Sequence, residues 1–136
     1  MKVNFGFSLV DIPASALTAE RLRMDVVSNN IANVDTTRTP TGGPYRRRFV
    51  VFEPILDEDV PRGVRVSAVL ADNSPPRLVY DPSHPDANAA GYVAYPNIDI
   101  VTEMVDLMGA TRAYEANSVS LSMARSMYLK TLEIGR

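Results

Sequence analysis

Apolar and polar positions in the first part of the chain recur with the period of an α-helix. Between residues 8 and 34, two apolar stripes run side by side, each with spacings of three and four residues. The stripes are Ile12, Ala16, Ala19, Leu22 and Val26, and beside them Leu17, Met24, Val27, Ile31 and Val34. Pro13 fits the first turn of such a helix, where its missing N–H costs nothing, and Ser8 or Asp11 would cap that turn. The pattern therefore predicts a helix roughly 40 Å long with two apolar faces.

The middle of the chain, residues 35–96, is rich in turn-forming residues. It holds nine of the ten prolines, which excludes long helices. Four short runs rich in β-branched and aromatic residues are bounded by Pro, Asp or Gly, and one of them alternates with period two. These runs are 49–52, 63–70, 77–80 and 92–95. We expect three or four short strands, arranged as hairpins.

After Asn97 the helical period returns and persists to the end of the chain. The repeating positions follow a four-three spacing close to a heptad. They are Ile100, Met104, Leu107, Thr111, Tyr114, Ser118, Leu121 and Tyr128. Either Asp99 or Asn97 is placed to cap this helix, and Gly109 is its only interior breaker, at a cost of about 1 kcal/mol. The predicted helix is roughly 50 Å long.

These elements predict an α+β fold with three regions: an N-terminal helix over 1–34, a Pro-rich β segment over 35–96 and a C-terminal helix over 97–136. We expect the two long helices to pack as an antiparallel, coiled-coil-like pair. The middle segment is too small and too rich in proline to cover both helices, so other chains must bury part of their apolar surface. This remaining surface includes the Met-rich side of the C-terminal helix. The alternative is a closed intramolecular bundle.

Three asparagines lie among apolar residues in the stretch Ser28–Asp35. Asn29 continues the stripe of Leu22 and Val26, and Asn33 follows it by four residues. A buried amide at such a position lowers stability but defines the register of the helices, because it must find one matching hydrogen-bond partner. The other interpretation is that these residues end the helix, since Asn tolerates the left-handed cap conformation.

Charge and hydropathy exclude several classes of function. Fourteen Lys and Arg against sixteen Asp and Glu leave a formal charge of -2, so no overall field attracts nucleic acid or an anionic membrane. The short basic run Arg46–Arg48 fits a solvated strand edge or a contact with an acidic neighbour better than a nucleic-acid patch. No stretch approaches the ~20 apolar residues of a membrane helix. Met1–Val10 is too short and interrupted for a cleaved secretory signal. We expect neither nucleic-acid binding nor membrane spanning.

The sequence also lacks the residues on which catalysis or cofactor binding would depend. It contains no cysteine, which removes disulfides, thiolate metal sites and cysteine nucleophiles. The single histidine, His84, lies between Asp81 and Asp86, but the neighbouring prolines are typical of a turn rather than a metal site. We therefore predict no enzyme activity, no cofactor, and no catalytic, cofactor-binding or metal-binding residues.

The stretch Ser28–Asn33, followed closely by Asp35, resembles the N-terminal signature of the flagellar rod and hook protein family. The loop over 37–47 resembles the longer form found in the proximal rod members of that family. Further segments that resemble the family are 75–82, 84–86, 91–97, 103–108, 112–117 and 132–136. The resemblance covers nearly the whole chain and is weakest over 1–7 and 54–62.

The resemblance implies a structural subunit of the flagellar basal-body rod. Such a protein is exported unfolded through the flagellar type III apparatus, without a cleaved signal peptide. It assembles in the periplasm beneath the hook with other rod proteins and further copies of itself. Its terminal helices would lie in an inner helical tube, with the middle segment outside. We expect the ends to be poorly ordered in the monomer and to fold when neighbours cover their apolar stripes.

We expect the assembly interface to combine apolar helix positions with the Asn-rich stretch. The predicted interface residues are Leu22, Val26, Asn29, Asn30, Ile31, Asn33, Met104, Leu107, Met108, Tyr114, Asn117, Leu121, Met123 and Met127. The alternative function is a soluble or secreted helical adaptor that binds one partner through its amphipathic ends. Open-ended polymerisation would separate the two functions, because an adaptor complex stops growing at a defined size.

Overall fold

The computed structural model describes the backbone of residues 5–58 and 60–134, with side chains from Val10 onward. Two helices enclose four strands in the chain order α1, β1, β2, β3, β4, α2. The elements are α1 (Phe5–Ala32), β1 (Arg48–Asp57), β2 (Val60–Ala71), β3 (Arg77–Tyr80), β4 (Tyr92–Tyr95) and α2 (Ile100–Ile134). The strands form two antiparallel hairpins, β1–β2 and β3–β4. The predicted α+β fold, with long terminal helices around a central region of hairpins, is confirmed.

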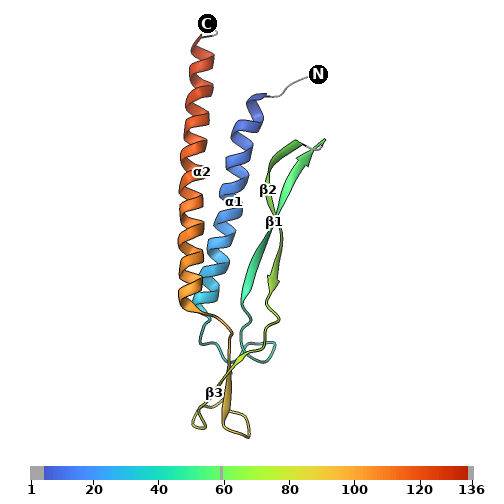
Figure 1. Ribbon diagram of the computed structural model, residues 1–136, viewed down its shortest axis with the longest axis vertical. Helices are drawn as coiled ribbons and strands as arrows, with labels where there is room; N and C mark the ends of the chain where they lie inside the picture. The colour runs from blue at the N-terminus through green and yellow to red at the C-terminus, as the bar shows by residue number, and fades with distance from the viewer. Residues whose placement is uncertain (1–4, 59, 135–136) are drawn as a thin grey trace.

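The molecule is elongated, with three elements side by side along its length (Figure 1). Helix α1 lies between α2 and the β1–β2 hairpin, while the β3–β4 hairpin projects at the end remote from both termini. Two contacts show that the helices are antiparallel. Asn30 forms a hydrogen bond with Glu103, and Met24 lies against Thr111. The contact that lies nearer the start of α1 therefore lies nearer the end of α2. The predicted antiparallel pairing of the helices is therefore correct.

Helix α1 begins earlier than its capping signals predicted. It starts at Phe5 rather than near Ser8, so Pro13 lies inside the helix and neither Ser8 nor Asp11 caps its start. The prediction that Pro13 occupies the first turn was wrong. A proline inside a helix removes one backbone hydrogen bond, and here the buried Pro13 ring is covered by neighbouring residues.

The β1–β2 hairpin is longer than the predicted short strands, because it continues through Pro54 and Pro61. Its register pairs Arg48 with Ala71 at the base and Asp57 with Val60 at the tip. In a two-stranded sheet both strands are edge strands, which can accommodate proline because one side of each strand has no ladder partner. An isolated hairpin is only marginally stable, so the packing of the β1–β2 hairpin along α1 stabilises these long strands.

The face of α2 that packs on α1 shares only some positions with the predicted seam, and the other positions are shifted by one residue along the sequence. Leu107, Tyr114 and Leu121 are half-buried, as expected for seam positions. The other predicted seam positions are exposed: Ile100, Met104, Thr111, Ser118 and Tyr128. The observed seam is completed by Glu103, Ala110, Asn117 and Ala124. Among these positions Ala110 and Ala124 are small, which lets the two helices approach closely, and the methionines at 104, 108, 123 and 127 lie outside the seam.

Candidate functional site: the junction between the helices and the loop

A polar cluster joins three parts of the fold at the base of the helix pair. Asn30 lies in the last turns of α1, and Glu103 lies in the first turn of α2. The loop that follows α1 brings Tyr45 and Arg47 between them, and Arg48 follows as the first residue of β1. Asn30 and Glu103 are 0% and 1% exposed, the two buried polar residues in the part of the chain that the structure describes. We call these five residues the junction.

Every hydrogen-bonding group of the Asn30 amide is used. Its nitrogen donates to the Arg48 carbonyl at 2.7 Å and to Oε2 of Glu103 at 2.9 Å. Its oxygen accepts from the Arg48 backbone N–H at 2.9 Å and from the Tyr45 hydroxyl at 3.2 Å. An amide offers two donors and two acceptor sites, so the burial of Asn30 leaves none of them unsatisfied.

Glu103 is compensated by a cation as well as by Asn30. The Arg47 Nε donates to its Oε1 at 2.5 Å, and the same guanidinium reaches Asp106 at 3.4 Å. Asp106 also faces Arg23 of α1 at 3.7 Å. A charge network therefore ties α1, the loop and α2 together. The sequence-based interpretation that the arginine run contacts an acidic neighbour is confirmed for Arg47.

Burial also affects the protonation of the loop tyrosine. Burial raises the pKa of Tyr45; the charge of Arg48 opposes this effect and the charge of Glu103 adds to it. The phenol therefore remains protonated around neutral pH and donates to Asn30. Arg48 completes this side of the junction by lying over the Tyr45 ring, 5.9 Å from its centroid.

The junction selects one arrangement of the helices. A buried charged pair adds little net stability compared with apolar packing, but removal of one partner costs about 3–5 kcal/mol. Alternative registers of α1 on α2 would move Asn30 away from Glu103 and break the hydrogen bond between them, which leaves Oε2 of Glu103 without this donor. The arrangement therefore performs positioning rather than chemistry.

The two interpretations of the Asn-rich stretch were each partly right. A buried amide does define register, but it is Asn30 rather than Asn29 or Asn33. Asn29 is exposed and donates to the Asp25 carbonyl, and Asn33 donates to the Asn29 carbonyl just beyond the helix end. The helix ends here without a left-handed residue, since Glu58 is the only non-glycine residue with positive φ in the described chain. The left-handed cap was therefore wrong.

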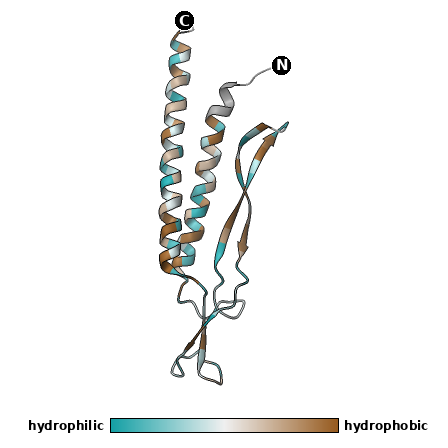
Figure 2. Cartoon of the chain, viewed as in Figure 1, coloured by the Kyte–Doolittle hydropathy of each residue, from teal (hydrophilic) through white to brown (hydrophobic). Residues whose placement is uncertain are grey.

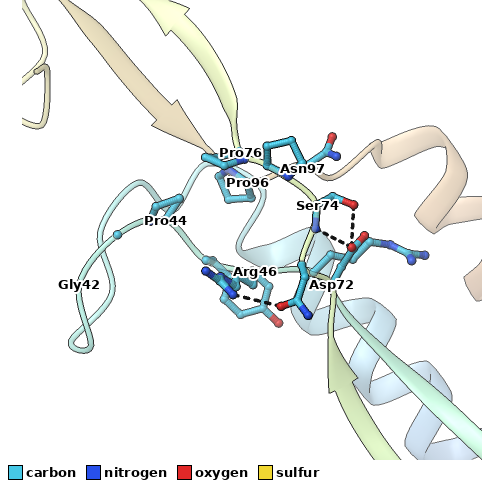
Figure 3. Close-up of a pocket in the computed structure, with 13 residues that line it drawn as sticks. Gly42, Pro44, Arg46, Asp72, Ser74, Pro76, Pro96 and Asn97 are labelled. Atoms are coloured by element: carbon cyan, nitrogen blue, oxygen red, sulfur yellow. Dashed lines mark hydrogen bonds between the residues drawn. The ribbon is translucent and has the colours of Figure 1, made fainter.

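Below the junction, three chain segments cross where the β3–β4 hairpin joins the rest of the molecule. Residues 42–47, 72–76 and 96–97 enclose a cavity of about 220 Å³ (Figure 3). Prolines line this cavity from all three segments, and proline fixes φ. Arg46 bonds across it to Asn73 at 3.2 Å. These restraints stiffen the connection between the hairpin and the helices.

The structure separates the predicted interface residues into three groups. Val26 and Asn30 are buried within the chain. Half-buried positions are Ile31, Asn33, Leu107, Tyr114, Asn117 and Leu121. Exposed positions are Leu22, Asn29, Met104, Met108, Met123 and Met127. The exposed group is available to another chain.

The side of α2 that faces away from α1 carries an apolar surface. Its residues are Val101, Met104, Val105 and Met108, which are 68%, 53%, 58% and 54% exposed. Figure 2 shows apolar residues gathered in the first turns of α2, close to the loops. We call these four residues the outer α2 surface. The helices thus form an open pair rather than a closed bundle.

Sequence reasoning missed most of the junction. Glu103 and Tyr45 were not among the predicted site residues; each lay only within a segment that resembles the family, 103–108 and 37–47. The available signal was the spacing of Glu103, Leu107, Ala110 and Tyr114, which repeats by four and three as a seam does. Only the fold shows that Asn30 and Arg47 reach that position.

The other polar motifs have structural explanations. His84 lies in a turn, where its Nδ1 accepts from the Asp86 backbone N–H at 3.1 Å. Residues 5–58 and 60–134 contain no group of three or more potential ligands able to hold a metal ion. Within the same residues, neither helix is long and apolar enough to pass through a membrane.

Comparison with known proteins identifies the family. A model described as "Flagella basal body rod protein" matches residues 11–38, and a model described as "Flagellar basal body rod FlgEFG protein C-terminal" matches residues 89–134. The basal-body rod protein FlgC of Borreliella burgdorferi is 46% identical, over 94% of this chain and 96% of the relative. The chain belongs to the FlgC family.

Other FlgC relatives match this chain over nearly their whole length. FlgC of Bacillus subtilis is 46% identical over 96% of this chain and 99% of the relative, and that of Salmonella typhimurium is 43% identical over 95% and 97%. The chain is accordingly a structural subunit of the flagellar basal-body rod, and the adaptor alternative is not favoured. Its relatives are structural proteins rather than enzymes. The two family matches include Asn30 and Glu103 respectively, the two buried residues of the junction.

Proposed function

We propose that this FlgC-family chain is a proximal rod subunit that polymerises helically through its terminal helices, with other rod proteins and with further copies of itself, to form the drive shaft beneath the hook. The observation that carries the proposal is the outer α2 surface, where four adjacent apolar side chains remain more than half exposed. A contiguous apolar surface of this kind marks a protein interface.

The outer α2 surface can supply much of the assembly energy. Full burial of a Val or Met side chain contributes about 1.5–3 kcal/mol. Since the four side chains are already partly covered, their burial by a neighbour contributes on the order of 4 kcal/mol. Leu22, Met123 and Met127 would extend the contact along both helices. Val26 and Asn30, which lie inside the chain, would support this surface rather than touch the neighbour.

The junction would determine the stiffness of the subunit. Asn30, Glu103 and Arg47 hold the loop against both helices, so the outer segment cannot rotate freely about the helix pair. In the organisation that we propose, residues 1–34 and 97–136 form the inner tube and residues 35–96 lie outside it. A shaft that transmits torque needs such a fixed connection between its layers.

We further propose that the ends of the helices remote from the junction become ordered on assembly. α2 is 35 residues long and α1 is 28, and the last turns of α2 extend beyond the first turn of α1 (Figure 1). Exposed apolar residues such as Tyr128, Leu129 and Leu132 lie in these turns. Their helix would be stabilised by neighbours, because most helical stability comes from packing.

Export through the flagellar type III apparatus, followed by assembly in the periplasm without signal cleavage, completes the proposal. A chain without cysteine forms no disulfide that would have to break before it threads through an export channel. The mass of the protein recovered from assembled rods tests this part. An intact N-terminus is expected, whereas a shortened one would contradict export without cleavage.

Assembly is tested with the double substitution Met104→Gln and Met108→Gln. Gln keeps a straight side chain and a similar helix propensity but removes the apolar contact. The variant should retain the helix content of the wild type by circular dichroism and lose co-sedimentation with other rod proteins. The matched control is Leu78→Thr, which removes an apolar side chain of comparable exposure, 62%, from β3. Equal assembly of all three proteins would refute the proposal.

A further inference from the structure

A groove runs along the side of the molecule between α1 and β2. Its floor is formed by small or apolar residues, including Ala19 and Leu22 of α1 and Val64 and Val66 of β2, and its volume is about 500 Å³. Arg21 and Asp25 of α1 also line it. In Figure 1 this side of α1 faces the hairpin, whereas α2 lies on its other side. The groove and the outside of α2 are therefore different faces of one chain.

The outside of α2 continues beyond the outer α2 surface as a mixed ridge. Arg112 and Glu115 follow Met108 at spacings of four and three, and Val119 and Met123 come next. All of these residues are exposed. The ridge therefore presents one cation and one anion, followed by two apolar side chains.

The charged residues that α1 contributes to the groove, and those of the ridge, have no ion-pair partner among the described residues, whereas Arg65 of β2, which also lines the groove, pairs with Glu53. Among residues 10–58 and 60–134, no ion pair involves Arg21, Asp25, Arg112 or Glu115. In contrast, Arg23, which faces the interior of the fold, pairs with Glu20 and Asp106. Each surface thus carries one unpaired charge of each sign.

The charges of the ridge are complementary to those of the groove when the ridge of one copy lies antiparallel to the α1 of the next. This is the direction that α1 and α2 have within one chain, and it arises when neighbouring copies point the same way. Asp25 then lies level with Arg112, and Arg21 with Glu115. Four residues along α1 correspond to about 6 Å and three along α2 to about 4.5 Å, a mismatch that long side chains absorb.

The same register places apolar residues of the ridge over the groove. Continuing from Arg21 towards the start of α1 and from Glu115 towards the end of α2, Val119 lies level with Thr18 and Met123 with Ser15. Thr18 and Ser15 line the groove together with Val64. Charge order and apolar content therefore agree on one register.

We propose that the groove between α1 and β2 receives the α2 ridge of a second copy of this chain, with Asp25 facing Arg112 and Arg21 facing Glu115 of the neighbour. The inference rests on the proposed function and names one of its lateral contacts. The contact is heterologous, because groove and ridge are different surfaces, and repetition without closure generates an open helical array.

Engineered cysteines test the contact directly, because the chain contains none of its own. The double variant Asp25→Cys and Arg112→Cys is oxidised under native conditions. A heterologous contact should yield a ladder of cross-linked trimers and longer species, whereas each single variant yields at most dimers. The control variant Asp25→Cys and Arg77→Cys carries the second cysteine on β3, outside the ridge, and should form no ladder. Absence of a ladder, or an equal ladder in the control, would overturn the proposal.

Charge reversal provides a second test. Asp25→Arg and Arg112→Asp should each weaken self-association by roughly threefold to tenfold, and the chain that carries both should recover most of the loss. Circular dichroism of each variant verifies that the helices are retained. If the double reversal is as weak as the sum of the single ones, the pairing is wrong.

These tests separate the contact from the proposed function. If no ladder forms while the chain still co-sediments with other rod proteins, only the groove contact fails. If the wild-type chain associates neither with itself nor with rod proteins, the proposed function fails as well.

Discussion

The substitution Asn30→Asp tests the junction with almost no change of shape. The new oxygen would replace the amide nitrogen that now lies 2.9 Å from Oε2 of Glu103 and 2.7 Å from the Arg48 carbonyl. Both hydrogen bonds would be lost, and two carboxylates would face one another in a buried site. Each unsatisfied buried group costs about 1–3 kcal/mol, and rupture of a buried charged network costs about 3–5 kcal/mol.

We therefore expect Asn30→Asp to lower the free energy of unfolding by about 4 kcal/mol at pH 7. For a small protein this lowers the urea midpoint by roughly 2 M, measured by circular dichroism at 222 nm. The loss should shrink at acidic pH, because a proton on one of the two carboxyls removes the repulsion and restores a donor. The assay follows unfolding of the wild type and the variant across this pH range.

Asn29→Asp is the matched control, since it makes the same chemical change one residue earlier. Asn29 is exposed and bonds only to the Asp25 carbonyl within its own helix. We expect a change within about 0.5 kcal/mol, as for most surface substitutions. Equal losses for Asn29→Asp and Asn30→Asp would refute the view that the junction holds the helices in register.

Three further predictions concern the backbone and the helix cap. Gly63→Ala should weaken the packing of the β1–β2 hairpin on α1, because φ is +155° and a Cβ would lie 2.4 Å from Oγ of Ser15. Amide hydrogen exchange in β2 should then be faster than in the wild type, and unchanged exchange would contradict the prediction. Gly109→Ala should instead raise the free energy of unfolding by about 0.5–1 kcal/mol, since the site is helical with nothing within 4 Å of the new Cβ; a lower urea midpoint would argue against that open surface. The hydroxyl of Thr102 and the backbone N–H of Val101 hold the pKa of Asp99 below its ordinary value of 3.8. Asp99 therefore stabilises the fold above that value and loses this contribution as pH falls through its lowered pKa. Asp99→Asn should flatten the acid side of the stability curve, and an unchanged pH profile would exclude the effect.

Local pattern was sufficient for the elements and their order. The helical period over the first and last parts of the chain, and the proline-bounded apolar runs between them, predicted two long helices around three or four short strands arranged as hairpins. These signals are local, because a helix or strand depends on residues a few positions apart. Element ends were less certain: Pro13 suggested a helix start that lies further upstream, and Pro54 and Pro61 did not stop strands that lie at an edge.

The family signature was also present in the sequence, in the Asn-rich stretch and the loop after it. The structural role of that stretch could not be predicted from the sequence. Asn29, Asn30 and Asn33 have the same side chain, and they differ only in the direction in which each points around the helix axis. Which of them is buried depends on where α2 and the loop pass.

Tertiary structure alone decided the junction and the exposed surfaces. Glu103 lies in the seam because Asn30 and Arg47 reach it from 73 and 56 residues away in the chain. Without those partners a buried carboxylate would be too costly, so a sequence pattern correctly disfavours it. The same rotation of α2 turns Met104 and Met108 outward. Burial is a property of what surrounds a residue, and only the folded chain supplies those surroundings.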